Sequence, residues 1–220
     1  YISVTDTAAN LTSGNALLAL AKHIVVTDTI TAAQYTAIAA VSAADDMVYS
    51  LSDTAANLAG LGNAVLAAAT SAVATTSATA LQAQTLDNDA TFSIVDTAAN
   101  FANFTASASN ATNITVSGSL TAANATTIVN YTNAGTTSIA TVTGTPADLT
   151  TLAGLLNANT TVTNVTPSAA LTVAQATAMV NAGATITAYH LSDTAAHLAA
   201  ASSGILNNAT NIALSGGVAT

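Results

Sequence analysis

The feature that most constrains the fold of this chain is a phrase of about ten residues that recurs along it. Its core is Asp-Thr-Ala-Ala followed by Asn or His, and an aromatic residue with alternating apolar and Ser/Thr residues precedes it. The aspartates of successive copies are 47, 43 and 97 residues apart, and the last gap is about two periods. A fixed period of this size is typical of a repeat architecture. The copies span residues 1–10, 49–57, 92–100 and 189–197.

A second phrase lies between these copies and halves the period. It begins with β-branched residues, as in Ile24–Gln34 and Ile114–Asn124. In each half-period an alternating apolar and Ser/Thr segment predicts a half-buried strand. The Asp-Thr or Gly-Ser/Thr pair that follows predicts a turn and a helix start, and an alanine-rich segment predicts the helix. Strand, turn and helix in roughly 22 residues match the size of a leucine-rich-repeat coil.

The pattern therefore predicts an α/β repeat solenoid, similar to a leucine-rich repeat or a β-helix. We expect its strands to form a single parallel β-sheet of stacked coils across residues 1–220, with residues 73–90 as the weakest repeat. The sequence opens in mid-phrase and neither end carries a polar cap, so we expect a segment of a longer array or an end-to-end assembly. Strands are predicted to start near residues 1, 23, 48, 73, 91, 112, 137, 162, 185 and 211.

The charge balance excludes several classes of partner. Hydrophobic residues make up 51% of the chain and charged residues 5%, with Lys22 as the only cation and a net charge of −9. Nucleic acid and anionic lipid are bound mainly through cations, so we expect neither as a partner. The absence of cysteine excludes disulfides and thiolate metal sites. Apolar runs are short and rich in alanine, and we predict no membrane-spanning helix.

The recurrent aspartates are the main candidate site, and two interpretations of them stay open. Equal positions in successive coils stack, so a ladder of carboxylates would offer oxygen ligands to Ca²⁺. Alternatively, each Asp caps its helix or closes its turn. Gly118, Gly144 and Pro167 interrupt the ladder, which favours the structural interpretation and leaves calcium as the alternative. The calcium candidates are Asp6, Asp28, Asp53, Asp96 and Asp193; the turn or cap candidates are Asp6, Asp53, Asp96, Asp193, Asn10, Asn57 and Asn100.

The remaining polar and aromatic residues indicate no catalytic site. No Cys or Glu joins the histidines into a zinc site, and no nucleophile-elbow motif is present, so we predict that the chain is not an enzyme. The aromatic position of the repeat predicts a core stack, with a sugar-binding face as its alternative. Thr-X-Thr pairs would suit ice, but they fall at irregular places in the coil. The histidines are His23, His190 and His197, and the aromatic position of the repeat holds Tyr1, Tyr49, Phe92 and Tyr189.

Three phrases resemble repeats in very large bacterial surface proteins. They are Ser-Asp-Thr-Ala-Ala-Asn-Leu at 52–58, Leu-Thr-Ala-Ala-Asn at 120–124 and Leu-Thr-Val-Ala-Gln at 171–175. The family comprises S-layer and giant adhesin-like proteins of cyanobacteria and proteobacteria. The resemblance implies export, an extracellular place at the bacterial cell surface, and no catalytic residues. We therefore expect a structural segment of a surface layer, fibre or giant adhesin that associates with copies of itself or with adjoining repeats. A carbohydrate- or ice-binding module with a Thr/Asn/Tyr face, and hence a surface glycan as partner, is the alternative.

Overall fold

Strands and helices alternate throughout the part of the chain that the structure describes. The structure is a computed structural model, and it describes residues 2–13, 16–42, 44–104, 108, 110–131, 133–186 and 188–216. The strands are β1 (Ser3–Asp6), β2 (His23–Ile30), β3 (Asp46–Asp53), β4 (Ser71–Ala74), β5 (Ile94–Thr97), β6 (Ile114–Thr121), β7 (Thr137–Gly144), β8 (Thr160–Pro167), β9 (Tyr189–Asp193) and β10 (Ala209–Leu214). The helices are α1 (Ala8–Thr12), η1 (Ala16–Leu20), α2 (Ala32–Val41), α3 (Ala55–Leu61), α4 (Asn63–Ala68), α5 (Ala80–Leu86), η2 (Asp87–Asp89), α6 (Ala98–Phe104), α7 (Ala122–Val129), α8 (Pro146–Ala153), α9 (Val173–Asn181), α10 (Ala195–Ala200) and α11 (Ser203–Asn207).

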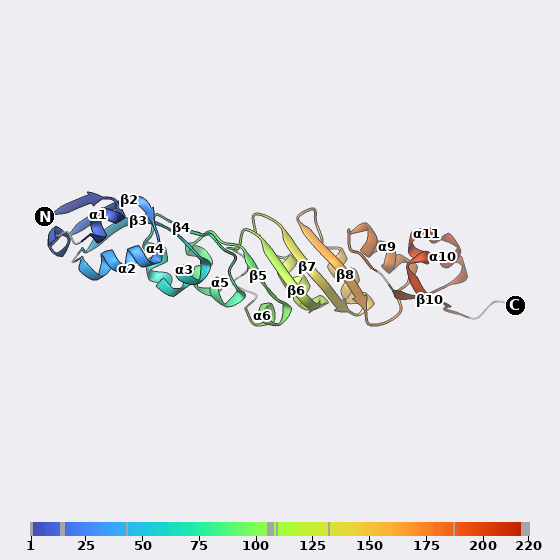
Figure 1. Ribbon diagram of the computed structural model, residues 1–220. Coiled ribbons are helices and arrows are strands. Elements are labelled where there is room, and N and C mark those ends of the chain that lie inside the picture. Colours follow the sequence, from blue (N-terminus) through green and yellow to red (C-terminus); the bar gives the residue numbers. More distant parts are fainter. Residues whose placement is uncertain are drawn as a thin grey trace. The chain divides into compact units, whose positions relative to one another are not determined.

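The predicted alternation of parallel strands and short helices is confirmed, and most strands begin within two or three residues of the predicted positions (Figure 1). We call each strand with the helices that follow it a module, numbered by its strand. The segment predicted to be the weakest repeat, 73–90, holds the end of β4, α5 and η2. Its strand, β4, has four residues.

The expectation of a single continuous sheet is wrong. The strands form three separate parallel sheets, ordered β1-β2-β3-β4, β5-β6-β7-β8 and β9-β10. Where one sheet stops, the described residues continue the pairing through isolated bridges, such as Val73 with Thr91 and Leu171 with Leu191. The physical cause is extra residues in one of two neighbouring segments, which lift the backbone out of hydrogen-bonding reach. Between the bridges Val73–Thr91 and Ala78–Ile94, for example, four residues lie on one segment and two on the other.

The chain divides into two compact parts, which are described separately. The N-terminal part holds residues 1–95 with 110–112, and the C-terminal part holds 96–109 with 113–220. In the N-terminal part β2 pairs with β3, but the register shifts between Val25 and Thr29, so that β2 carries two more residues than β3 there. Buried Ile30 still pairs with buried Leu51 beyond this bulge. The bulge therefore alters the backbone of β2 locally, while the buried residues beyond it remain paired with those of β3.

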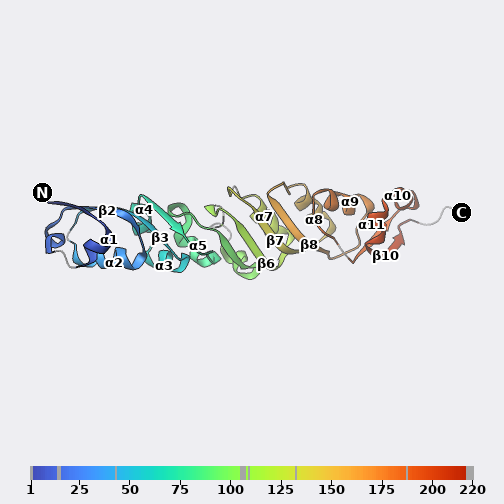
Figure 2. The same ribbon diagram turned by 45° about the horizontal axis from the view of Figure 1, so that its top comes forward.

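In the C-terminal part β6, β7 and β8 lie side by side, and α7 and α8 pack on this sheet (Figure 2). Alternate strand residues point to the core because successive side chains of a strand face opposite sides of the sheet. The register aligns Val116, Ile139 and Val162 in one buried row. A second buried row holds Leu120, Val142 and Val165. Burial of such β-branched and aliphatic rows is the main source of stability, at about 25 cal/mol per Å² of apolar surface.

Candidate functional site

The recurrent phrase forms a compact corner between a strand and a helix. At residues 53–57, Asp53 Oδ1 accepts hydrogen bonds from the Thr54 backbone N–H at 2.7 Å and the Asn57 side-chain amide at 2.9 Å. The Thr54 hydroxyl accepts from the Asn57 backbone N–H at 3.2 Å and so caps α3. Thr54 is therefore the N-cap, and Asp53 lies one residue before it. We call the segments 6–10, 53–57, 96–100 and 193–197 the Asp corners.

The other Asp corners repeat this arrangement. In each, the aspartate Oδ1 accepts from the backbone N–H of the next residue, at 2.7–2.8 Å. The side chain four residues later donates to the same oxygen at 2.7 Å, from Asn10, Asn100 or His197. His197 thus takes the place of the asparagine and keeps its hydrogen bond. This geometry explains why Asp, Thr and Asn recur at fixed spacing.

The second carboxylate oxygen of two Asp corners reaches back to the preceding module. Asp53 Oδ2 accepts from the backbone N–H of Ala32, the first residue of α2, at 3.0 Å. Asp193 Oδ2 accepts from the backbone N–H of Val173, the first residue of α9, also at 3.0 Å. The first N–H groups of a helix have no partner inside the helix, so an outside acceptor satisfies them. Each of these aspartates therefore joins two consecutive modules.

Where the next module lacks an aspartate immediately before its N-cap, another acceptor does the same work. Asp28 lies in the bulge of β2, and its Oδ1 accepts from the Ala8 N–H of α1 at 2.7 Å. Thr76 follows β4, and its hydroxyl accepts from the Ala55 N–H of α3 at 3.1 Å. Both acceptors lie three residues before the N-cap threonine of their own module. The sequence does not reveal these contacts, because the partners are about 20 residues apart.

Hydrogen bonds lower the pKa of three of the corner aspartates. For Asp6, the Asn10 amide and then the Thr7 N–H favour the charged form, and its pKa lies below 3.8. Burial acts to raise the pKa of Asp53, but hydrogen bonds from Asn57, Thr54 and Ala32 outweigh it and the pKa is lowered.

For Asp193, the hydrogen bond from His197 is the largest cause of a lowered pKa, followed by those from Thr194 and Val173. A carboxylate that accepts several N–H groups holds its charge to lower pH.

A second kind of corner uses glutamine instead of aspartate. At residues 31–34, the Thr31 hydroxyl accepts from the Gln34 N–H at 3.2 Å, and the Gln34 side chain accepts from the Thr31 N–H at 2.9 Å. This reciprocal pair is a capping box. The residue before the N-cap is apolar and buried, as Ile30 shows. We call the segments 31–34, 79–82 and 172–175 the Gln corners.

The calcium candidates do not gather into a metal centre within the described residues. No three His, Cys, Asp or Glu side chains of that part of the chain come close enough to hold a metal ion. Oδ1 of Asp6, Asp53, Asp96 and Asp193 faces N–H donors, and Asp28 holds the Ala8 N–H. A Ca²⁺ ion needs several oxygen ligands at once. Calcium binding therefore stays a hypothesis that these contacts do not favour.

Two of the histidines, His23 and His197, and the single lysine make local polar contacts. His23 Nδ1 lies 2.8 Å from Asp46 Oδ2. Lys22 Nζ lies 3.4 Å from Asp45 Oδ2, and both of these side chains are well exposed. His190 is exposed on β9.

The aromatic residues of the repeat lie in the core, which removes them from a sugar-binding face. Tyr49, Phe92 and Tyr189 are each at most 3% exposed, and Tyr1 lies outside the described residues. The Tyr49 hydroxyl donates to the Val65 carbonyl in α4, at 2.6 Å. The Tyr189 hydroxyl donates in the same way to Ile205 in α11. Burial raises the pKa of Tyr189, as expected for a phenol without access to water.

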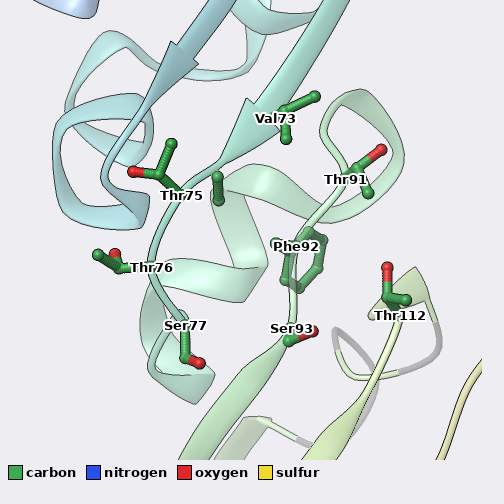
Figure 3. Close-up of a pocket in the computed structure, with 9 residues that line it drawn as sticks. Val73, Thr75, Thr76, Ser77, Thr91, Phe92, Ser93 and Thr112 are labelled. Carbon is green, nitrogen blue, oxygen red and sulfur yellow. The ribbon is translucent and has the colours of Figure 1, made fainter.

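One pocket of about 240 Å³ opens in the N-terminal part where β4 and the next segment separate (Figure 3). Thr75, Thr76 and Ser77 line one side of it, and Thr91 and Ser93 line the other. It occupies the place where the extra residues interrupt the pairing. Its lining is uncharged, so its chemistry is limited to hydrogen bonds from hydroxyl and backbone groups.

The outer face of the β6–β8 sheet is also rich in hydroxyl groups. Along one row Thr115, Ser138 and Thr161 are in register, and each is at least partly exposed. A second row holds Ser119, Thr141 and Asn164. This face offers hydroxyl and amide groups without charge.

Comparisons with known proteins give no relative. No family model, curated protein or solved structure matches the chain. No helix among the described residues is long and apolar enough to cross a membrane.

Proposed function

We propose that this chain is a structural, non-enzymatic repeat segment of a bacterial extracellular surface layer, fibre or giant adhesin. In this proposal its modules are the coils of a repeat solenoid, and its partners are copies of itself or adjoining repeats. The observation that carries the proposal is the contact between modules, in which an acceptor of one module holds the first helical N–H of the module before it. Because each such contact needs only a neighbouring module, further modules can be added to the array by the same contact.

The scarcity of charge supports the same function. With 5% charged residues, the surface is covered mainly by Thr, Ser, Asn and Ala, which suits contact with similar surfaces better than isolation in water. An edge strand presents unpaired N–H and C=O groups that recruit another strand. Self-association through the edges or sides of the modules follows from these two properties.

Electron microscopy of the purified chain, with calcium and with a chelator, tests this function. We expect ordered fibres or sheets in both conditions, since the corner aspartates are engaged by N–H donors. Fibres that dissolve in chelator would assign the aspartates to calcium and keep the structural function. Monodisperse monomers at high concentration in both conditions would reject self-association.

A second candidate function is binding of carbohydrate or ice, which the hydroxyl-rich outer face of β6–β8 favours. Rows such as Thr115, Ser138 and Thr161 offer regularly spaced hydroxyl groups. A glycan array and a thermal-hysteresis assay test this candidate on the isolated chain. Thr161→Lys, which places a charge on the face away from the core, is the control that should abolish any signal. The absence of both signals would remove this candidate.

A further inference from the structure

A groove of about 460 Å³ lies beside the first half of β8, in the C-terminal part of the chain. Leu156, Asn157 and Thr161 line one wall, where the chain turns from α8 into β8. Asn181 and Gly183 line the other wall, in the turn after α9. Clefts that hold small ligands are typically about 300–1,000 Å³. This groove is therefore large enough for a small ligand, whereas the pocket beside β4 is smaller than that range.

The groove exists because the strand segment that follows β8 begins late. Val165 lies 23 residues after its partner Val142 in β7, but its next partner, Ile186, lies only 21 residues further on. Counting back from that bridge sets Asn181 opposite the first residue of β8, but Asn181 still belongs to α9. The N–H groups of residues 182–184 then donate back to carbonyls of α9. Among the described residues, no strand therefore covers the start of β8 on this side.

The groove offers amide and hydroxyl groups that the fold does not use. The Asn181 side chain and the Thr161 hydroxyl are exposed and have no hydrogen-bond partner among the described residues. Asn157 Oδ1 accepts from the Asn159 N–H at 2.8 Å and from the Thr160 hydroxyl at 3.3 Å, which fixes the turn. These bonds occupy the Asn157 oxygen and leave its NH2 group for a ligand. An amide offers two donors and an acceptor, and a hydroxyl offers both functions.

The side chains that line the groove indicate the class of ligand. None of them is charged, and Leu156 adds a partly buried aliphatic side chain to one wall. A neutral saccharide carries hydroxyl groups around a ring with apolar C–H groups, so it matches both kinds of lining. An acidic sugar or a phosphate is bound best by a cation, and Lys22, the only cation, lies in the N-terminal part.

An extended peptide fits this groove less well than a saccharide. A strand added to the edge of a sheet needs the backbone N–H and C=O groups of that edge. The Thr160 N–H, at the start of β8, already donates to the Asn157 carbonyl at 3.0 Å. A peptide strand would therefore lack a donor there, whereas the side chains of the two turns offer polar groups that a sugar can use.

We propose that the groove between residues 156–161 and 181–183 binds a neutral saccharide. The amides of Asn157 and Asn181 bond to the sugar hydroxyl groups, and Leu156 packs against its C–H groups. This inference goes beyond the proposed structural function and does not depend on it. It also differs from the second candidate function, because the sugar lies in one groove at the edge of β8 and not on the outer face of β6–β8.

Saturation-transfer difference NMR of the full chain tests the groove, because it detects a bound sugar whether the protein is monomeric or assembled. The probes are the neutral trisaccharides of glucose, galactose, mannose and N-acetylglucosamine, with the trisaccharide of galacturonic acid as the charged comparison. We expect at least one neutral probe to bind with a Kd of about 1 mM or tighter, and the acid to give no transfer. No transfer to any neutral probe, or equal binding of the acid, would overturn the proposal. Transfer only to an extended peptide of alternating Ser and Val would assign the groove to a peptide strand and also overturn it.

Two variants of the groove place the bound sugar. Asn181→Ala removes an exposed amide that has no partner among the described residues, and it should weaken binding by about fivefold or more. Ala158→Phe puts a ring into the groove from an exposed turn position and should abolish transfer. Both positions are exposed, so the melting temperature should stay unchanged. Binding that neither variant weakens would overturn the proposal.

Two matched controls lie outside the groove. Asn130→Ala removes an exposed asparagine at the end of α7, and Thr115→Lys adds a charge to the outer face of β6. Both variants should bind the sugar as the unaltered chain does. Binding that is lost in Thr115→Lys and kept in Asn181→Ala would place the sugar on the outer face, which would overturn this inference and keep the second candidate function.

Electron microscopy of the same samples separates this inference from the proposed structural function. Saccharide binding in the groove without any fibre or sheet would retain the inference and reject the surface-layer function. Fibres or sheets of a chain that binds none of the neutral probes would do the reverse.

Discussion

The Gln corner at 31–34 and the Asp corner at 53–57 solve one local problem in two ways. In both, a threonine hydroxyl accepts the third helical N–H at 3.2 Å. In both, a side-chain oxygen accepts the N–H of that threonine, from Gln34 at 2.9 Å or from Asp53 at 2.7 Å. Glutamine has a single side-chain acceptor oxygen, and this oxygen is engaged within the Gln corner. The Asp corner has a second carboxylate oxygen, and this oxygen holds the Ala32 N–H of the preceding module.

This difference separates the capping of a helix from the joining of modules. The glutamine accepts the N–H of the N-cap threonine within its own corner. The residue before that threonine can therefore be apolar, as Ile30 is. Where an aspartate lies before the N-cap threonine instead, the module loses a buried apolar side chain and gains a hydrogen bond to the preceding module. The two kinds of corner alternate along the chain: modules 1, 3 and 5 have Asp corners, and modules 2 and 4 have Gln corners.

The largest expected effect is that of removing the joining carboxylate. Asp53→Ala leaves the Ala32 and Thr54 N–H groups and the Asn57 amide without their acceptor. We expect a loss of about 1–3 kcal/mol in the free energy of unfolding, measured by urea denaturation. Asp45→Ala, which removes only an exposed ion pair with Lys22, is the control and should change it by less than about 1 kcal/mol. Equal losses for the two variants would contradict a joining role.

Acid should weaken the Asp corners before the Gln corners. The pKa of Asp53 is lower in the folded chain than its ordinary value of 3.8, so its contribution is present above that pH and is lost as pH falls toward the folded value. We expect the stability of the chain to fall below about pH 5 and the acid limb to flatten in Asp53→Asn. Urea midpoints between pH 7 and pH 2 measure this. The same acid dependence in both proteins would refute the assignment.

The threonine caps should contribute equally at both corners. Thr31→Ala and Thr54→Ala each remove one acceptor from the third helical N–H. We expect each to cost about 1 kcal/mol, because N-cap threonines are worth about that much. Calorimetry of the two variants beside Thr→Ser controls measures the difference between them. A much larger cost at Thr54 would mean that the hydroxyl, too, takes part in joining the modules.

Gln34→Ala should have a smaller and purely local effect. The Thr31 N–H loses its acceptor at an exposed position where water replaces it. We expect a cost of about 0.5 kcal/mol, with unchanged hydrogen exchange in module 3. Slower or faster exchange of the Ala55 amide in this variant would show that Gln corners also act across modules.

The smallest effect is expected for His197→Asn. The asparagine restores the Asp-Thr-Ala-Ala-Asn phrase, and it can donate to Asp193 Oδ1 as Asn57 does to Asp53. We expect the melting temperature at pH 7 to move by less than about 2 °C. A shift several times larger would show that the imidazole has a role beyond the corner.

The sequence predicted much of the local structure and little of the contact between modules. Alternation and alanine-rich runs indicated the strands and helices, and the spacing of Asp53 and Asn57 marked a turn. The sequence did not reveal that Asp53 reaches Ala32 or that Asp28 reaches Ala8, since such partners depend on strand register. The two-residue bulge of β2 sets that register, and no residue type in it is specific for a bulge. The separation into three sheets escaped prediction for the same reason.

A double-mutant cycle between Asp53 and Ala32 tests the joining of modules most directly. Ala32→Pro removes the N–H donor and Asp53→Ala removes the acceptor, and the cycle cancels the separate effects of proline shape and corner loss. We predict that the two changes are not additive: the double variant loses at least about 0.5 kcal/mol less than the sum of the single losses. Additive losses would show that Asp53 serves only its own corner and would contradict the account.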